Sequence, residues 1–194
     1  NTMLWFCSDN GPEGNDSAPG KTGGFRGRKR SLYEGGIRTP TIVNWRGQLA
    51  PGTIDHPVHV VDWMPTLSEL VDARPRTDPR WDGIDIWPLI SGLEQEPPER
   101  CIYWNFRRGS HLGVRRGGWK LISSQGEGKR TLQLFDIAAD PHEFDDLADD
   151  PAQVSILADL QERLLAQWDP VVVEERVLQS QRERLLIERA AQVD

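Results

Sequence analysis

Four short strand-like segments follow one another between residues 101 and 137, and they constrain the fold more than any other feature. They cover residues 101–106, 111–116, 119–124 and 131–137, with turn residues between them. Strands this short and closely spaced are typical of an antiparallel sheet. Residues 150–168 follow with apolar residues at helical spacing, with Asp150 as the expected N-cap and Pro151 in the first position. We therefore expect a small four-stranded antiparallel sheet with a helix packed on one face.

The residues before this sheet predict an α/β arrangement. Residues 3–7 are a continuous apolar run, as in a buried strand of a parallel sheet, and residues 41–45 form a second apolar strand. Residues 60–72 show helical spacing, with Pro65 suited to a first turn. The fold class is thus α/β, followed by the small four-stranded antiparallel sheet.

Three regions follow from this pattern, with a boundary near residue 93. Residues 1–92 are expected to be part of an α/β domain and residues 93–170 a small α+β subdomain. Residues 171–194 are expected to be a charged helical or loosely docked tail. The chain has no initiator Met and starts as if in the middle of a sheet, where a strand needs neighbours. We therefore interpret it as the C-terminal part of a longer protein.

Composition excludes several classes of protein. A formal net charge of −7 argues against general nucleic-acid binding. No apolar run approaches the roughly 18 residues of a transmembrane segment. The two cysteines, Cys7 and Cys101, lie far apart without a C-x-x-C partner, which argues against a zinc knuckle or redox pair. Two buried free thiols are expected, with one disulfide as the alternative.

The first apolar strand ends in an unusual group of residues, Ser8-Asp9-Asn10-Gly11. Ligands of α/β sheets bind at the carboxyl ends of strands. The carboxylate of Asp9 and the amide oxygen of Asn10 suit a hard cation such as Ca²⁺ or Mg²⁺. The alternative is an ordinary turn, because Asp, Asn and Gly are favoured turn residues.

A basic cluster follows in residues 21–38, and no acidic residue lies between Lys21 and Arg30. Its members are Lys21, Arg26, Arg28, Lys29, Arg30 and Arg38. Lysine and arginine bind phosphate or sulfate oxygens, so the cluster indicates an anion site. The alternatives are a solvated loop or a nucleic-acid patch. Gly35 and Gly36 permit close backbone approach, and Glu34 is expected to pair with Arg38 or Lys29.

The remaining polar residues give weaker indications. His111 precedes a strand and is a candidate for a cleft residue, although a structural role is the alternative for each histidine. The acidic residues between Asp136 and Asp150 lack the spacing of an EF-hand loop. We interpret that run as a solvated turn followed by a helix cap.

Six motifs occur in an order that resembles the C-terminal half of the sulfatase family, in the alkaline-phosphatase-like superfamily. Any one of them is weak, but the ordered set is specific and covers residues 1–168. The motifs are FCSDNG (6–11), RGRKRSLYEGGIRTPTIVNW (26–45), VVDWMPTLSEL (60–70), DGIDIWPLISG (82–92), VRRGGWKLI (114–122) and LQLFDIAADPHEFDDLA (132–148).

The resemblance implies a calcium-dependent sulfuric ester hydrolase acting on a sulfated small molecule or glycan. In this family a formylglycine hydrate attacks the sulfur, while calcium and basic residues hold the sulfate oxygens. By position, Asp9 and Asn10 match late calcium ligands and Lys29 matches the lysine that contacts the sulfate. Glu34 and Arg38 match the family's loop, in a structural role. As an extension of this match, His111 is expected to be a substrate-pocket residue. The sequence leaves the compartment open, and the resemblance is compatible with a periplasmic, secreted or lysosomal location.

The chain also departs from the family pattern. Neither Cys7 nor Cys101 fits the Cys/Ser-x-Pro/Ala-x-Arg motif that yields formylglycine. The family's paired N-terminal Asp residues and central histidines are absent, so we expect this chain alone to be inactive. Two alternatives stay open: a phosphodiesterase or phosphonate hydrolase of the same superfamily, and a non-catalytic module that binds calcium or an anionic glycan.

Overall fold

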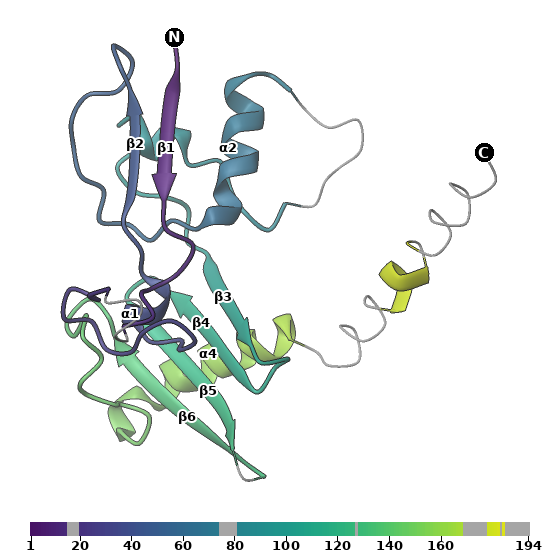
Figure 1. The fold of residues 1–194 in the computed structure, drawn as a ribbon. Coiled ribbons are helices and arrows are strands. Elements are labelled where there is room, and N and C mark those ends of the chain that lie inside the picture. Colours follow the sequence, from purple (N-terminus) through teal and green to yellow (C-terminus); the bar gives the residue numbers. More distant parts are fainter. Residues whose placement is uncertain (15–19, 74–80, 127, 169–177, 183, 185–194) are drawn as a thin grey trace.

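The computed structural model describes residues 1–14, 20–73, 81–126, 128–168, 178–182 and 184. Figure 1 shows a two-stranded sheet with a helix beside it, and below it a four-stranded sheet backed by a second helix. The elements are β1 (Met3–Cys7), α1 (Glu34–Ile37), β2 (Thr41–Trp45), η1 (Val60–Asp62), α2 (Trp63–Leu70), α3 (Trp87–Ile90), β3 (Cys101–Phe106), β4 (His111–Arg116), β5 (Trp119–Gly126), β6 (Lys129–Asp136), η2 (Pro151–Gln153) and α4 (Val154–Gln167).

The four-stranded sheet confirms the pattern expected for residues 101–137. Its strands are antiparallel in the order β3-β4-β5-β6. Val114, Leu121 and Leu134 are register partners across β4, β5 and β6, so they form one row on one face. Because side chains alternate along a strand, Arg115, Lys120 and Phe135 form a row on the opposite face.

Helix α4 covers the first face of this sheet, as its apolar spacing predicted. Leu160 and Leu164 are buried against Val114, Leu121 and Leu134. The helix is preceded by the 3₁₀ turn η2, which starts at Pro151, and Asp150 caps that turn by accepting a hydrogen bond from Ala152 N. We call this side of the sheet the helix face.

Residues 25–38, which we call the basic loop, cover the opposite face. Leu32 of this loop packs into a cluster with Ile122 and Phe135 of the sheet. The Tyr33 hydroxyl donates to Gln133 Oε1 at 2.7 Å, which ties the loop to β6. The sheet is therefore enclosed between α4 and the basic loop, and we call this second side the loop face.

The two-stranded sheet differs from the expected parallel arrangement. Strands β1 and β2 pair antiparallel, and β1 alternates between half-buried and exposed residues instead of being buried throughout. Trp5 points toward α2 and packs against Trp63 in a tilted arrangement, with ring centroids 4.7 Å apart. Leu4 and Phe6 point the other way and are exposed. The continuous apolar run therefore has only one covered face within the described chain.

A buried carboxylate links two of the sequence motifs. Asp62 has no exposed surface, and its carboxylate accepts hydrogen bonds from the backbone of His59 and Ile84 and from both terminal nitrogens of Arg100. The Thr66 hydroxyl accepts from Ile86 N at 3.0 Å. These contacts join the helix motif at 60–70 to the segment at 82–92.

Several other expectations can be placed on the structure. Cys7 and Cys101 are both free and half-buried, which agrees with free thiols but not with full burial. No helix in the described ranges is long and apolar enough to cross a membrane. The tail expected over 171–194 falls mostly outside the described residues. The boundary near residue 93 stays a prediction.

Candidate functional site

The polar residues after β1 form a compact turn. Asn10 N donates to Asp9 Oδ1 at 3.0 Å, and the Ser8 hydroxyl donates to Asn10 O at 3.1 Å. The Asp9 side chain is exposed and that of Asn10 is half-buried. The turn expected from residue type is therefore present, and it places a carboxylate and an amide side chain at the end of the strand.

Gly11 joins this turn to the basic loop. Its backbone N donates to Gly36 O at 2.8 Å. A Cβ atom at position 11 would lie 1.9 Å from Gly35 O, so no larger residue fits at this contact. The predicted role of Gly35 and Gly36 in close backbone approach is thus visible in the structure.

Lys29 lies beside the same turn. Its backbone N donates to Pro12 O at 3.0 Å, so the loop returns to the segment that follows Asp9 and Asn10. Neighbouring cations are engaged, because Arg30 pairs with Glu13 and Arg28 donates to Gly14 O. The exposed Lys29 side chain forms no hydrogen bond or ion pair with any residue in the described ranges.

Glu34 is buried, and Lys29 is not among its ion-pair partners in the described ranges. Its side chain is 2% exposed and lies 2.9 Å from Lys120 Nζ, with Arg115 at 3.7 Å and Arg38 at 3.8 Å. The expected pair with Arg38 is present, although the shortest contact is to Lys120. The structural role proposed for Glu34 and Arg38 stays a prediction, and these contacts support it.

Glu143 is a residue that the sequence reasoning missed. It was assigned to a solvated turn, but its side chain has no exposed surface. Its carboxylate accepts from Lys120 Nζ at 2.9 Å and from Glu34 N at 2.6 Å. Burial raises the pKa of Glu143, and the charge of Lys120 acts in the opposite direction. Lys120 is equally buried, and a lysine within the strand-like segment 119–124 is the kind of signal that could have indicated a buried acidic partner.

His111 is not brought into contact with Lys29 by any interaction in the described ranges. It starts β4 on the loop face, with its ring edge-on to Phe106 at 6.1 Å and its Nδ1 3.0 Å from the Ser110 hydroxyl. Arg115, which pairs with Glu34 of the basic loop, lies four residues further along β4. At the usual rise per residue, His111 is therefore about 13 Å from that contact along the strand. A substrate-pocket role for His111 stays a prediction.

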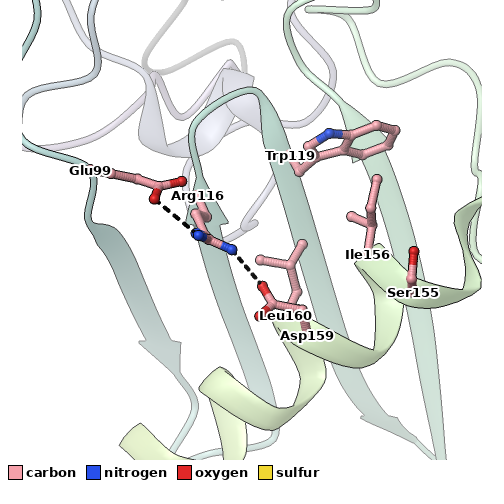
Figure 2. Close-up of a pocket in the computed structure, with 7 residues that line it drawn as sticks. All are labelled: Glu99, Arg116, Trp119, Ser155, Ile156, Asp159 and Leu160. Carbon is pink, nitrogen blue, oxygen red and sulfur yellow. Dashed lines mark hydrogen bonds and ion pairs between the residues drawn. The ribbon is translucent and has the colours of Figure 1, made fainter.

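A cavity also lies on the helix face, on the other side of the sheet from the basic loop (Figure 2). Arg116 crosses it and pairs with Glu99 at 3.0 Å and Asp159 at 3.1 Å. Its charged groups therefore satisfy one another, and the cavity is separated from Lys29 by the sheet. We do not assign it to the candidate site.

The candidate metal ligands are chemically suitable but incomplete. No group of three or more His, Cys, Asp or Glu residues that could hold a metal ion occurs in the described part of the chain. The side-chain oxygens of Asp9 and Asn10 suit a hard cation, which takes six to eight oxygen ligands when it is Ca²⁺. These two residues therefore fit part of a calcium site.

Comparison with known proteins identifies the class to which this fold belongs. The solved structures that match include proteins with the alkaline-phosphatase-like fold of sulfatases. Residues 21–169 match the family model described as N-sulphoglucosamine sulphohydrolase, C-terminal. The chain belongs to this sulfatase family.

Individual relatives agree with the family. Choline-sulfatase of Rhizobium meliloti is 29% identical over 198 residues, covering 97% of this chain and 36% of the relative. Human arylsulfatase A is 36% identical over 104 residues, covering 53% of this chain and 20% of the relative. The chain thus spans only about a third and a fifth of the length of these two proteins.

Solved structures give the same result. One from Bacteroides thetaiotaomicron, from work on the metabolism of multiple glycosaminoglycans, has a TM-score of 0.73 and 26% identity, and the match covers 86% of this chain and 38% of that one. Phosphonate monoester hydrolase of Agrobacterium radiobacter has a TM-score of 0.58 and 19% identity over 84% of this chain and 34% of its own. The second match shows a shared fold only.

Proposed function

We propose that this chain is the C-terminal part of a calcium-dependent sulfatase that hydrolyses sulfate esters. One observation carries the proposal: the loop bearing Lys29 is bonded to the turn bearing Asp9 and Asn10. The bonds are Gly11 N to Gly36 O and Lys29 N to Pro12 O. A lysine without an ion-pair partner among the described residues and two oxygen ligands for a hard cation therefore lie on segments that are bonded to each other.

Lys29 contributes charge to the reaction. Its ammonium group has no carboxylate partner among the described residues, so it is free to bind a sulfate oxygen. Cleavage of the ester places additional negative charge on the sulfate and leaving-group oxygens. An ammonium group at this position stabilises that charge more in the transition state than in the bound ester.

Asp9 and Asn10 would supply two of the oxygen ligands to Ca²⁺, which would polarise the sulfate as a Lewis acid. Formylglycine, expected from an upstream segment, would supply the nucleophile. Because two ligands are far fewer than Ca²⁺ requires, this chain alone should bind calcium weakly. Because it also lacks a Cys/Ser-x-Pro/Ala-x-Arg motif for the nucleophile, it should not turn over sulfate esters by itself.

The proposed substrate is a sulfated small molecule or glycan. Three relatives are named steryl-sulfatase, choline-sulfatase and N-acetylgalactosamine-6-sulfatase. The substrates in these names share the sulfate group and differ in the organic group that carries it. The candidate residues likewise bind the sulfate end of the substrate. The proposal therefore concerns the reaction class and leaves the organic group open.

The proposal is tested by replacing Lys29 in the complete enzyme, by which we mean this chain joined to its upstream segment. Lys29→Ala should lower kcat/KM for a sulfate ester by about 100-fold, the range for loss of one charge-stabilising group. The matched control is Lys129→Ala, an exposed lysine at the start of β6. Unchanged turnover in Lys29→Ala, or sustained turnover by the 194-residue chain alone, would contradict the proposal.

The same enzyme distinguishes the two alternatives. The fold shared with the phosphonate monoester hydrolase makes phosphorus chemistry the second enzymatic candidate. Faster turnover of a phosphonate monoester than of the matching sulfate ester would favour it. Calorimetric binding of Ca²⁺ or a sulfated sugar by the 194-residue chain, without any need for the upstream segment, would favour the non-catalytic module.

A further inference from the structure

A buried charged cluster connects the basic loop to the C-terminal sheet. It consists of Glu34 from the loop, Lys120 from β5 and Glu143 from the turn after β6. Lys120 Nζ lies 2.9 Å from Glu34 Oε1 and 2.9 Å from Glu143 Oε1. All three side chains are at most 2% exposed. Three segments that are distant in sequence are therefore held together at one point.

Glu143 accepts hydrogen bonds from two residues of the basic loop. Its carboxylate accepts from Glu34 N at 2.6 Å, and its backbone carbonyl accepts from a terminal nitrogen of Arg26 at 2.7 Å. The Arg26 guanidinium also lies over the Tyr33 ring, 4.1 Å from its centroid. Residues 26 and 34 flank the stretch that carries Lys29, so both ends of that stretch are fixed to one residue.

The backbone of Glu143 indicates that these contacts determine its conformation. Its φ angle is 60°, in the left-handed region that non-glycine residues seldom adopt. Such a conformation persists where the surrounding structure imposes it. The hydrogen bonds to Glu34, Arg26 and Lys120 provide that surrounding structure.

The charged composition of the cluster favours a role in orienting the segments over a role in stability. Glu34 and Glu143 are balanced by Lys120 and by Arg115, which lies 3.7 Å from Glu34. Replacing a buried ion pair by apolar residues of similar volume is often neutral or stabilising, so stability alone does not explain such a cluster. A charged cluster with fixed hydrogen-bond directions does, however, specify how the segments are oriented.

We infer that Lys120 and Glu143 are positioning residues, which hold the basic loop so that Lys29 lies beside the turn of Asp9 and Asn10. This role rests on the proposed function, because it matters for catalysis only if Lys29 binds the sulfate. Neither residue reaches the substrate. They act through the loop. Two backbone hydrogen bonds, from Gly35 N to Arg26 O and from Lys29 N to Pro12 O, connect the part of the loop that they hold to Lys29.

The test uses the double variant Lys120→Met/Glu143→Leu. It removes one positive and one negative charge together, so it leaves no additional unbalanced buried charge. The matched control is Arg116→Met/Asp159→Leu, which removes an ion pair of 3.1 Å on the helix face of the same sheet. Glu143→Leu alone, which leaves Lys120 paired with Glu34, replaces the double variant if that variant does not fold. Glu143→Gln, which keeps an acceptor for Glu34 N, should behave like the parent chain.

The first readout is amide hydrogen exchange in the 194-residue chain. The amides of Gly11, Lys29 and Gly35 should exchange at least about tenfold faster in the double variant, while those of the sheet core keep their rates. The control should leave both sets unchanged. Uniformly faster exchange throughout the sheet would show a general stabilising role and overturn the inference, as would unchanged exchange in the loop.

The second readout is a double-mutant cycle on kcat/KM in the complete enzyme. The double variant should lose about tenfold when Lys29 is present and almost nothing when Lys29→Ala is already in place, because both changes remove one function. Additive losses would overturn the positioning role while leaving the proposed function intact. Full activity of Lys29→Ala by itself would overturn the proposed function and this inference with it.

Discussion

The four-stranded sheet and the two-stranded sheet differ in how much of their surface the described chain covers. The four-stranded sheet is enclosed by α4 on one face and the basic loop on the other, and Val114, Leu121 and Leu134 have no exposed surface. The two-stranded sheet packs one face against α2 and leaves Leu4 and Phe6 more than half exposed on the other.

Because of this difference, the residues that form the stable core and those proposed to take part in the reaction lie in different parts of the molecule. Asp9 and Asn10 follow β1 of the less covered part, and Lys29 lies beside them on the basic loop, whereas the enclosed core lies in the C-terminal sheet. Two-stranded sheets are marginal by themselves, so a neighbouring scaffold is needed to fix residues placed there. The contacts of the basic loop with β5 and the turn after β6 provide one.

The largest expected effect contrasts the two sheets directly. Leu121→Ala should destabilise the 194-residue chain by about 2–5 kcal/mol, because it opens a cavity in the enclosed core. Leu4→Ala, at a position that is 64% exposed, should change stability by less than about 0.5 kcal/mol. Urea unfolding followed by circular dichroism measures both. Equal losses from the two variants would contradict the contrast.

A smaller effect is expected where the basic loop closes on itself. A Cβ atom at Gly35 would lie within 2.5–2.7 Å of the carbonyl oxygens of Arg26, Gly27 and Phe25. Gly35→Ala should therefore force a backbone shift and cost about 1–3 kcal/mol. Gly52→Ala is the matched control, because a Cβ atom there meets nothing within 4 Å. Thermal unfolding compares them, and equal melting temperatures would show that the loop tolerates the shift.

The sequence predicts the enclosed part of the fold better than the open part. Short strand-like segments separated by turns predicted β3 to β6, and helical spacing predicted α4, because both signals are local in sequence. Residues 3–7 were expected to be buried as in a parallel sheet, but β1 pairs antiparallel with β2 and is partly exposed, since a continuous apolar run does not reveal which strand lies beside it or which face is covered. The short helices α1 and α3 have four residues each and carry no periodic signal.

The candidate site shows a similar division. The motif order indicated Asp9, Asn10 and Lys29, and the structure brings their two segments together through backbone bonds. Glu143 was missed because its burial depends on partners 23 and 109 residues away, Lys120 and Glu34. An acidic turn looks solvated in sequence whether or not one of its members is buried.

The junction between the two sheets is expected to show the smallest effect, a dependence of stability on pH at His59. The ring lies edge-on to Trp104 of β3 at 6.4 Å, and its Nδ1 accepts a hydrogen bond from Val61 N at 3.3 Å. An imidazolium ring has no acceptor at Nδ1, so protonation removes this bond. Burial lowers the pKa of His59 below its ordinary value of 6.5, against the opposing charge of Asp62, and Arg100 lowers it further.

Between the lowered pKa of the folded state and 6.5, the unfolded chain therefore binds more protons at His59 than the folded chain does. The stability that His59 contributes is present above pH 6.5 and is lost as the pH falls through the folded-state pKa. His59→Asn keeps a side-chain acceptor for Val61 N without a titrating ring. Urea unfolding at pH 7 and pH 5 should show a smaller loss of stability in this variant than in the parent chain. The same loss in both would mean that the junction is held by contacts that do not depend on the neutral ring.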